Sequence, residues 1–462
     1  MIQSTGRFFS HRLRTILSLA LLISGITLPG GAKASHSMGA DLTYECLGGN
    51  QYRLRLAFYR DCDGIPAPSQ VTINITSSCY ASRTVTLFPT PSSPLEISPI
   101  CATQVSSCQG GTYVGVQQWT YEGTVTLNGP CADWNFSFTE CCRNAAITNI
   151  PFASGYSMYV NATLNNLAAP CNSSPIFSNY PVPFACVGRN FVYNHGVYDA
   201  DGDSLVFQLV APRNTSVTDT VVYASGFSSQ IPLTSGLLPP NPPVIFDAST
   251  GEMVVYPTAQ EVTVLAVLVR EYRNGVLIGT VIRDIQLRIL PCSNAIPSLT
   301  GMNGFPQFTR NICVGSPCTF VIGSLDGNLS NTTTLTWDNG IPGATFTVFG
   351  SNNSAGFRRD SAVFNWTPTF ADVGSHYFTA TVVDDNCPYQ GLTIETYVLN
   401  VNYVDVTAGS DPTVACGQCT TLTAQNIGGR APITFTWNPG QSDSSNGAIR
   451  NPACTGTYIV QV

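Results

Sequence analysis

The sequence predicts an all-β protein in which tandem β-sandwich modules follow a cysteine-rich β domain. Three observations support this. Large apolar residues alternate with small or polar ones in many short segments, as from residue 51 to 58. Asn274-Gly275, a strong hairpin signal, joins two long apolar segments. The composition, with 40 glycines, 31 prolines and only 10% charged residues, favours strands and turns over helices.

Residues 1–34 have the features of a secretory signal peptide. Arg7, Arg12 and Arg14 form a basic start, an apolar stretch follows, and Ala32-Lys33-Ala34 is a small-x-small cleavage site. No later stretch reaches 18 consecutive apolar residues. We therefore expect a secreted or cell-surface protein whose mature chain has no transmembrane segment.

Charge and cysteine content narrow the class of protein further. The formal net charge is −7, and cleavage of the basic leader makes the mature chain more acidic still. Such a surface repels nucleic acid, so no nucleic-acid partner is expected. Seventeen cysteines in an exported chain predict a framework of disulfides.

The first mature block, residues 35–186, is predicted to be the cysteine-rich β domain. It holds ten cysteines, and this even number suggests that its disulfides close within the block. Adjacent Cys141 and Cys142 can form either a vicinal disulfide or separate bridges, and we favour separate bridges.

The second block, residues 187–292, is predicted to be a sandwich module with an acidic turn. Asp199, Asp201 and Asp203 alternate just before an apolar strand. Like charges this close repel by about 1 kcal/mol per pair in water, and calcium removes that repulsion by binding carboxylate oxygens. An EF-hand is excluded because its required Gly and Glu positions hold Ser204 and Val210. The alternative is an acidic turn without metal.

Residues 293–403 are predicted to be a divergent repeat of the second block. The ending Phe364-Asn365-Trp366-Thr367-Pro368-Thr369 matches the end of an earlier strand, but the acidic turn is reduced to Asp326-Gly327-Asn328. Any metal site here should be weaker or absent. The cysteines of this block are expected to pair among themselves or with a neighbouring block.

Residues 404–462 are predicted to be a truncated module, because the chain ends within a strand-like segment. Its Cys416-Gly417-Gln418-Cys419 motif is compatible with zinc, redox or disulfide chemistry. Only Cys454 is nearby as a further zinc ligand, so a disulfide is favoured.

Five motifs occur in order along the chain: Ser35-His36-Ser37-Met38-Gly39-Ala40, Tyr59-Arg60-Asp61-Cys62, Glu140-Cys141-Cys142-Arg143-Asn144, Asn172-Ser173-Ser174-Pro175 and Asn194-His195-Gly196. The series resembles the gliding-motility-associated, adhesin-like multidomain surface proteins of Bacteroidota. This resemblance implies type IX secretion and display at, or release from, the cell surface. It implies no catalytic residues.

Two further resemblances concern single modules. The second block resembles cadherin-like and immunoglobulin-like modules, in which the acidic turn meets a carboxylate of a later strand. That similarity implies Glu271 as the fourth calcium ligand and Asp247 as a weaker one. Residues 434–440 resemble part of a PKD-like surface repeat.

The function that we expect is a non-enzymatic, calcium-stabilised surface or adhesion protein whose partners are other surface proteins or glycans. One alternative is the non-catalytic part of an exported hydrolase, although H-E-x-x-H and G-x-S-x-G motifs are absent. A glycosidase, which needs only two carboxylates, stays possible. Another alternative is a carbohydrate-binding module using Trp119, Trp134 and Tyr156. The ligand and the oligomeric state are not predicted.

Overall fold

The computed structural model describes residues 37–236 and 242–403, together with six short strands between 405 and 461. The expected signal peptide and Cys416, Cys419 and Cys454 lie outside the described residues. The all-β prediction is confirmed, since the described part contains strands and four 3₁₀ turns. None of its helices has the length and apolar character needed to cross a membrane.

Residues 37–292 form one unit, here called the N-terminal unit. It contains the 3₁₀ turns η1 (Ser107–Gln109) and η2 (Ala153–Gly155). Its strands are β1 (Ser37–Gly48), β2 (Gln51–Asp61), β3 (Val71–Thr76), β4 (Arg83–Pro89), β5 (Leu95–Glu96), β6 (Val116–Thr126), β7 (Trp134–Cys141), β8 (Ser157–Leu164), β9 (Ile176–Phe177), β10 (Phe184–Cys186), β11 (Phe191–Tyr193), β12 (Val197–Tyr198), β13 (Ser204–Val210), β14 (Val244–Phe246), β15 (Met253–Val255), β16 (Glu261–Arg273) and β17 (Val276–Leu290).

The strand pairing of the N-terminal unit closes on itself. The order β1-β2-β6-β4-β3-β7-β8-β17 returns from β17 to β1, while β16 and then β13 extend from the other edge of β17. The circuit closes because β17 is 15 residues long. One of its edges pairs with β8 at Gly279–Val281 and with β1 at Arg283–Ile285.

The boundary predicted between residues 186 and 187 needs correction. β16 and β17 belong to the same sheet as β1 and β8, so residues 187–292 do not form a separate sandwich. The hairpin expected at Asn274-Gly275 is present between these two strands. Hairpin signals are local, however, and the sequence pattern did not reveal that β17 pairs with strands more than a hundred residues earlier.

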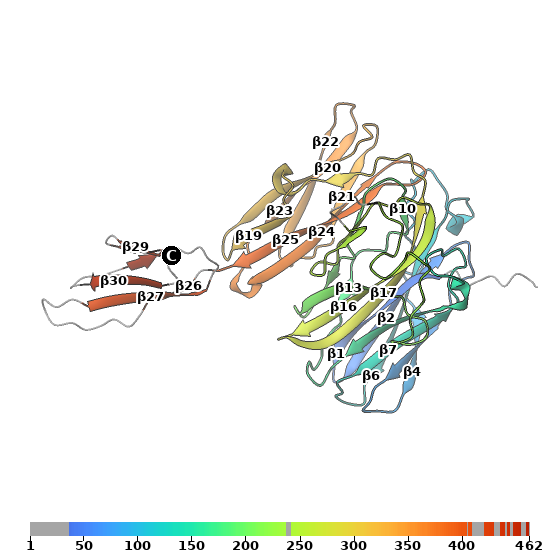
Figure 1. Ribbon diagram of the computed structural model, residues 1–462, viewed down its shortest axis with the longest axis horizontal. Helices are drawn as coiled ribbons and strands as arrows, with labels where there is room; N and C mark the ends of the chain where they lie inside the picture. Colours follow the sequence, from blue (N-terminus) through green and yellow to red (C-terminus); the bar gives the residue numbers. More distant parts are fainter. Residues whose placement is uncertain are drawn as a thin grey trace, which may run out of the picture.

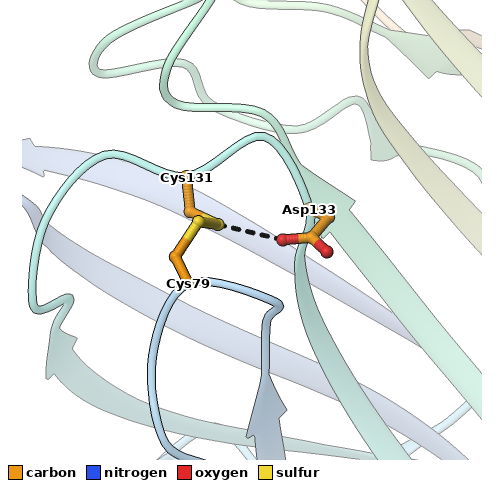
Figure 2. A group of neighbouring side chains, drawn as sticks. All are labelled: Cys79, Cys131 and Asp133. Carbon is orange, nitrogen blue, oxygen red and sulfur yellow. Dashed lines mark hydrogen bonds between the residues drawn. A yellow bond between two sulfur atoms is a disulfide. The ribbon is translucent and has the colours of Figure 1, made fainter.

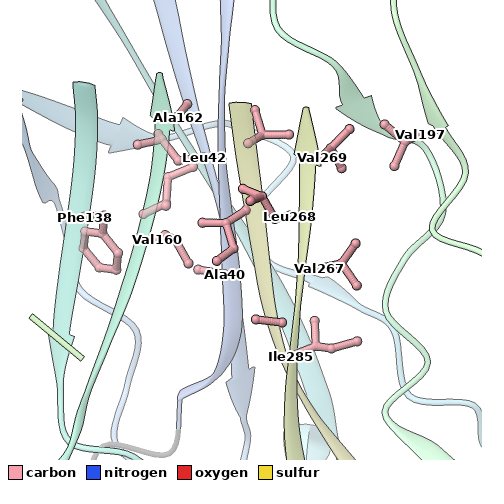
Figure 3. Packing of buried hydrophobic residues seen from close by; sticks show 14 of the residues in the cluster. Ala40, Leu42, Phe138, Val160, Ala162, Val197, Val267, Leu268, Val269 and Ile285 are labelled. Carbon is pink, nitrogen blue, oxygen red and sulfur yellow. The ribbon is translucent and has the colours of Figure 1, made fainter. Parts of the chain in front are cut away.

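One hydrophobic core spans the former boundary. Figure 3 shows Ala40 and Leu42 beside Val160 and Ala162, with Leu268 nearby. All five are buried. Burying a large apolar side chain contributes about 1.5–3 kcal/mol, so this shared core stabilises residues 37–292 as one unit.

Residues 293–403 form a second unit, here called the central unit, with 3₁₀ turns η3 (Met302–Gly304) and η4 (Phe370–Asp372). Its strands are β18 (Ser298–Leu299), β19 (Thr309–Cys313), β20 (Cys318–Leu325), β21 (Thr333–Trp337), β22 (Thr345–Asn352), β23 (Arg358–Trp366), β24 (Gly374–Asp384) and β25 (Leu392–Asn402). The ladders β18-β20-β23-β22 and β21-β24-β25-β19 form its two layers, and one pairing, Thr333 of β21 with Arg359 of β23, joins them into a continuous sheet. Phe320 and Phe364 of the first layer stack with Phe378 of the second, as expected for a sandwich core.

The remaining described strands form two three-stranded sheets, β26-β27-β30 and β29-β28-β31. They lie at one end of the molecule in Figure 1. Their bounds are β26 (Asp405–Ala408), β27 (Thr420–Gly428), β28 (Phe435–Asn438), β29 (Gln441–Asp443), β30 (Gly447–Ala453) and β31 (Ile459–Gln461).

The central unit docks on the N-terminal unit through polar contacts and through Ile394, which belongs to the same buried apolar cluster as the N-terminal core. Asn194 donates to Thr396 at 2.8 Å, Asn179 donates to Thr379 at 3.0 Å, and the hydroxyl of Tyr377 donates to the carbonyl of Val197 at 2.7 Å. A disulfide between Cys101 and Cys387 also joins the two units. Figure 1 shows the two units packed side by side.

The disulfides differ from the closed framework expected for residues 35–186. Six form among the described residues: Cys46–Cys171, Cys62–Cys108, Cys79–Cys131, Cys101–Cys387, Cys141–Cys142 and Cys186–Cys292. Two of these disulfides, Cys101–Cys387 and Cys186–Cys292, join residues 35–186 to later parts of the chain. The vicinal disulfide Cys141–Cys142, which we considered less favourable, is present. An even cysteine count is compatible with many pairings, so it could not exclude these. Cys313 and Cys318 are free thiols.

His195 lies in the segment that contacts the central unit, and only 1% of it is exposed. Neither ring nitrogen has a hydrogen-bond partner among the described residues. The rings of Tyr193 and Phe177 lie 4.7 and 6.1 Å away. Burial, together with the positive charge of Arg283, holds the pKa of His195 well below its ordinary value. The imidazole is therefore neutral in the folded protein at pH 7.

This burial predicts acid sensitivity. A histidine with a lowered folded-state pKa binds its proton in the unfolded state, so stability falls as the pH drops below about 6.5. We expect His195 to account for a loss of about 2 kcal/mol between pH 7 and pH 5. Urea unfolding of wild type and His195→Leu at both pH values measures it.

The comparison with the variant is necessary because other groups titrate too. Burial raises the pKa of Glu395 to about 8, and the nearby Glu252 adds to this shift. A raised carboxyl pKa acts in the opposite direction, since it favours the folded state as the pH falls. Only the difference between wild type and variant reports on His195. Equal losses in both proteins would contradict this prediction.

Candidate functional site

The acidic turn between β12 and β13 brings its three carboxylates together. Asp199 Oδ1 accepts the backbone N–H groups of Asp201 and Asp203 at 3.0 and 2.9 Å, which curls the chain back on itself. Gly202 has a φ of 81°, a conformation that glycine adopts without strain. One oxygen from each of the three aspartates lies within 4.8 Å of the others. The structure therefore groups the predicted trio.

Glu271, predicted as the fourth ligand, lies on β16 opposite Leu205 at the start of β13. Its side chain is fully buried. Asn172 Nδ2 donates to Oε1 at 2.6 Å, but Oε2 has no hydrogen-bond partner among the described residues. Oδ2 of Asp199 is also buried without a partner. Two buried carboxylate oxygens thus lack a donor, although the group of closely spaced ligand atoms contains the three aspartates and not Glu271.

The pKa values of Glu271 and Asp199 reflect the burial of their carboxyl groups. Burial raises the pKa of Glu271 to about 9, and the negative charge of Asp199 adds to the shift. Burial also raises the pKa of Asp199 to about 6; its hydrogen bond from Asp203 opposes this, and the charges of Asp203 and Asp201 contribute further. The pKa values of both carboxyl groups lie above their ordinary range because burial disfavours the negatively charged form.

Arg273, two residues beyond Glu271 on the same strand, was not predicted as part of the site. Its Nε and Nη2 donate to the two oxygens of Asp203 at 2.8 and 2.6 Å. Nη2 also donates to Asn172 Oδ1 at 2.7 Å and lies 3.6 Å from Asp201 Oδ2. Both oxygens of Asp203 are therefore engaged with the guanidinium, whereas Asp199, Asp201 and Glu271 keep oxygen atoms for another cation.

A loop from earlier in the chain completes the site. Besides the contacts of Asn172, the backbone N–H of Ser173 donates to Asp201 Oδ2 at 2.8 Å. Ser174 Oγ accepts the backbone N–H of Tyr44 at 2.9 Å. The disulfide Cys46–Cys171 fixes the start of this loop to β1. The motif Asn172-Ser173-Ser174 carried a signal in the sequence, but only as part of a family resemblance without an assigned role.

Asp247, predicted as a weaker ligand, forms a turn of its own. Its Oδ1 accepts the backbone N–H and the hydroxyl of Ser249 at 2.7 and 2.5 Å, and the N–H of Thr250 at 3.1 Å. Burial opposes a lowering of its pKa, but these hydrogen bonds prevail and hold the pKa below its ordinary value. Asp247 is not in the group formed by the three turn aspartates.

The reduced turn in the central unit has a related but smaller arrangement. Asp326 Oδ1 accepts the N–H of Asn328 at 2.7 Å, and its Oδ2 is buried without a partner. The buried Asp384 accepts a hydrogen bond from Asn294 at 2.6 Å, as Glu271 does from Asn172. The described residues place no third carboxylate, histidine or cysteine close enough to complete a cluster.

A second cluster of possible ligands contains a disulfide and therefore has a structural role. It consists of Cys79, Cys131 and Asp133. Figure 2 shows the two cysteines joined as a disulfide with Asp133 beside them. Asp133 Oδ1 lies 2.9 Å from Cys131 Sγ, and the carboxylate accepts the backbone N–H of Ser78 at 3.0 and 3.1 Å. Metals bind thiolates, which a disulfide does not offer.

The aromatic residues considered for sugar binding serve the core in this structure. Trp134 is 1% exposed, stacks on Tyr80, and donates from Nε1 to the carbonyl of Gly129 at 3.2 Å. Trp119 is stacked on Tyr121, and Tyr156 packs against a small buried cluster. These three do not form an exposed stacking surface.

Three charged residues of β17 form ion pairs: Arg283 and Asp284 are buried, and Arg288 is 19% exposed. Each partner belongs to the earlier block: Arg283–Asp41 at 2.8 Å, Asp284–Arg143 at 2.6 Å and Arg288–Asp61 at 2.5 Å. Arg143 and Asp61 occur in the motifs noted above. Arg283 lies on the same face of β17 as Ile285, whereas Asp284 and Arg288 lie on the other face, so ion pairs with the earlier block form on both faces of this strand.

No family model matches the chain, and no curated protein sequence matches it. Among solved structures, the N-terminal four immunoglobulin domains of Dscam1 isoform 6.44 are 12% identical with a TM-score of 0.23, covering 92% of this chain and 96% of that one. An ectodomain fragment of ICAM-5 is 13% identical with a TM-score of 0.21, covering 91% and 96%. An endo-fucoidan hydrolase of glycoside hydrolase family 107 is 13% identical with a TM-score of 0.16, covering 78% and 42%. These likenesses are too low to support a function.

Proposed function

We propose that this chain is a non-enzymatic, extracellular structural or adhesion protein and that calcium binds at the acidic turn of its N-terminal unit. The observation that carries the calcium site is the pair of buried oxygens, Asp199 Oδ2 and Glu271 Oε2, that have no hydrogen-bond donor among the described residues. A buried polar atom without a partner costs about 1–3 kcal/mol, and more when charged. A bound cation removes that cost.

The donor set fits calcium. Carboxylate oxygens and water are its usual ligands, six to eight in number. Asp199 and Asp201 would bind the ion directly, and solvent at the exposed Asp201 would complete the shell. Glu271 lies outside the group of three aspartates and would join the ion after a shift of its side chain. The guanidinium of Arg273 holds Asp203 at the edge of the site. Because the pKa of Glu271 is about 9, binding of the ion at pH 7 would release its proton. With all four carboxylates then ionised, Arg273 neutralises only one of them, so a divalent cation remains electrostatically favourable.

The proposed role of the ion is mechanical. Its ligands come from the turn before β13 and from β16, and the loop at Asn172 hydrogen-bonds to both groups. Binding would therefore tie three segments together at one end of the N-terminal unit. The Cys101–Cys387 disulfide and the polar contacts already join this unit to the next. An array stiffened in this way would hold an adhesive region away from its point of attachment.

Calcium should raise the thermal stability of the N-terminal unit. At a hundredfold excess over Kd the stabilisation is about 2.7 kcal/mol, and extracellular sites commonly have Kd values of about 10⁻⁴–10⁻³ M. Asp199→Asn keeps the Oδ1 acceptor of the turn but removes the charge, so we expect it to abolish most of the gain. Scanning calorimetry of the full chain with millimolar calcium and with chelator measures the effect.

Asp247→Asn is the matched control, because Asp247 accepts the same kind of turn hydrogen bonds outside the cluster. This variant should keep the full calcium-dependent gain, and Asp326→Ala in the reduced turn should too. A wild-type melting temperature that is the same in calcium and in chelator would show that the acidic turn is only a turn.

The resemblance to Bacteroidota surface proteins supports a finer proposal of type IX secretion and a role in surface adhesion or gliding. The six disulfides support an oxidising, extracellular location. Other surface proteins or glycans are the proposed partners. Binding of the labelled chain to whole cells and to a glycan array tests this, and binding confined to a single glycan class would favour the carbohydrate-binding alternative.

A further inference from the structure

β22 of the central unit has an edge without a partner. It pairs with β23 along all eight of its residues and with no other described strand. The described backbone hydrogen bonds outside ladders include none from residues 345–352. Seven of its eight residues are exposed. A strand edge of this length presents alternate N–H and C=O groups that only another extended segment can satisfy in series.

Three other strand edges among the described residues are protected. In the N-terminal unit, the outer edge of β13 is covered, since the N–H of Phe207 donates to the carbonyl of Ala248 at 2.8 Å. In the central unit, β18 has two residues, and β19 has five and includes Arg310. Short length, cover and charge are the usual ways in which proteins prevent edge pairing.

β22 has none of these protections. Its sequence, Thr-Phe-Thr-Val-Phe-Gly-Ser-Asn, contains no charge and no proline. Val348 and Phe349, which point to opposite faces, are 38% and 45% exposed. Near the turn to β23, Phe357 is 40% exposed and Leu329 is 56% exposed. Asn353 donates to the carbonyl of Leu329 at 2.8 Å, so these apolar residues adjoin the strand.

We propose that β22 pairs in antiparallel fashion with β22 of a second copy of this chain, which would join the sheets of two central units. Antiparallel pairing about a two-fold axis is self-complementary, and two-fold dimers are the commonest oligomers. A strand without charged side chains does not repel its own copy. It also offers no charge by which a charged foreign segment could be selected.

The pairing also matches the side chains of the strand. A two-fold axis perpendicular to the sheet places residues of the same face opposite each other. A register centred on Phe349 sets the two phenyl rings face to face across the new ladder, with Thr347 opposite Ser351. Aromatic pairs of this kind stabilise antiparallel ladders. Figure 1 shows β22 in the part of the central unit away from β16 and β17, so the N-terminal unit leaves this edge free.

Multi-angle light scattering of the full chain over a range of concentrations tests the proposal. Wild type should reach twice the monomer mass. Phe349→Lys sets two like charges opposite each other and should weaken the dimer at least about tenfold. Val321→Lys is the matched control, because Val321 is 38% exposed on β20, where the strand already has neighbours. This variant should dimerise as wild type does.

Each outcome decides the proposal. A monomeric wild type overturns it, including the case in which a foreign protein occupies the edge. Equal losses in Phe349→Lys and Val321→Lys also overturn it, because they would indicate association through a sheet face. If Phe349→Lys fails to fold, as judged by circular dichroism, Thr347→Lys introduces the same charge on the same face of β22. Calcium should not change the result, since the acidic turn lies in the other unit.

Discussion

Replacing Asp284 by Ala should destabilise the N-terminal unit by about 3–5 kcal/mol, the range for breaking a buried ion pair. Asp284 is 1% exposed, and its two oxygens accept from Arg143 at 3.0 and 2.6 Å. Its removal leaves the guanidinium of Arg143 buried without its counter-ion. Urea unfolding at pH 7, followed by tryptophan fluorescence, measures the loss.

Two further variants separate the ion pair from general effects of truncation. The double variant Arg143→Met/Asp284→Leu removes both charges and should recover most of the stability, because apolar replacements of buried pairs are often neutral. Glu45→Ala removes an ion pair with Arg53 in which both side chains are about half exposed, and it should cost at most about 1 kcal/mol. A cost for Asp284→Ala as small as that for Glu45→Ala would show that the buried pair is not a stabilising element.

Removing the Cys101–Cys387 disulfide should cost about 2–5 kcal/mol and loosen the docking of the central unit. The bridge spans 286 residues, and a longer closed loop constrains the unfolded chain more. The polar contacts at Asn194 and Asn179 remain in the double variant Cys101→Ser/Cys387→Ser. We therefore expect both units to stay folded but to separate more readily. Thermal unfolding and limited proteolysis of residues 291–297 measure the two effects.

The vicinal disulfide supplies the control. Cys141 and Cys142 are adjacent, so their bond closes almost no loop. The variant Cys141→Ser/Cys142→Ser should lose far less stability than the variant without the long bridge. Similar losses for both would contradict the loop-closure explanation.

Local features of this protein were predictable from its sequence, whereas long-range ones were not. The Asn274-Gly275 hairpin and the turn of Asp199, Asp201 and Asp203 depend on residues close in sequence, and the structure contains both. The closure of β17 onto β1 depends on which distant edges meet. Alternation in β17 could not reveal it, because Asp284 is polar yet buried against Arg143.

The candidate site shows the same limit. The similarity to cadherin-like modules led to Glu271; the structure pairs this residue with Leu205, just after the acidic turn, but outside the group that the three aspartates form. Arg273 was missed, although a cation two residues along a strand lies on the same face as Glu271. Asn172 was missed because a contact over 99 residues leaves no local signal. Asp247 was included by the same similarity, but its Oδ1 accepts the N–H groups of Ser249 and Thr250 in a turn of its own, outside the aspartate group.

The closed circuit of the N-terminal unit has a consequence for how the chain folds. β1 begins at Ser37, yet one of its partners, the segment Arg283–Ile285, is made some 240 residues later. Such non-local pairing makes folding slow, because the entropy of closing the loop is lost before the contact forms. During synthesis β1 has only β2 beside it, and one of its edges stays open until β17 emerges. An emerging chain of this kind remains in a partly open state for longer than one built from sequential hairpins. Charges of β1 that end up buried, among them Asp41, stay in water until β17 supplies the partner Arg283.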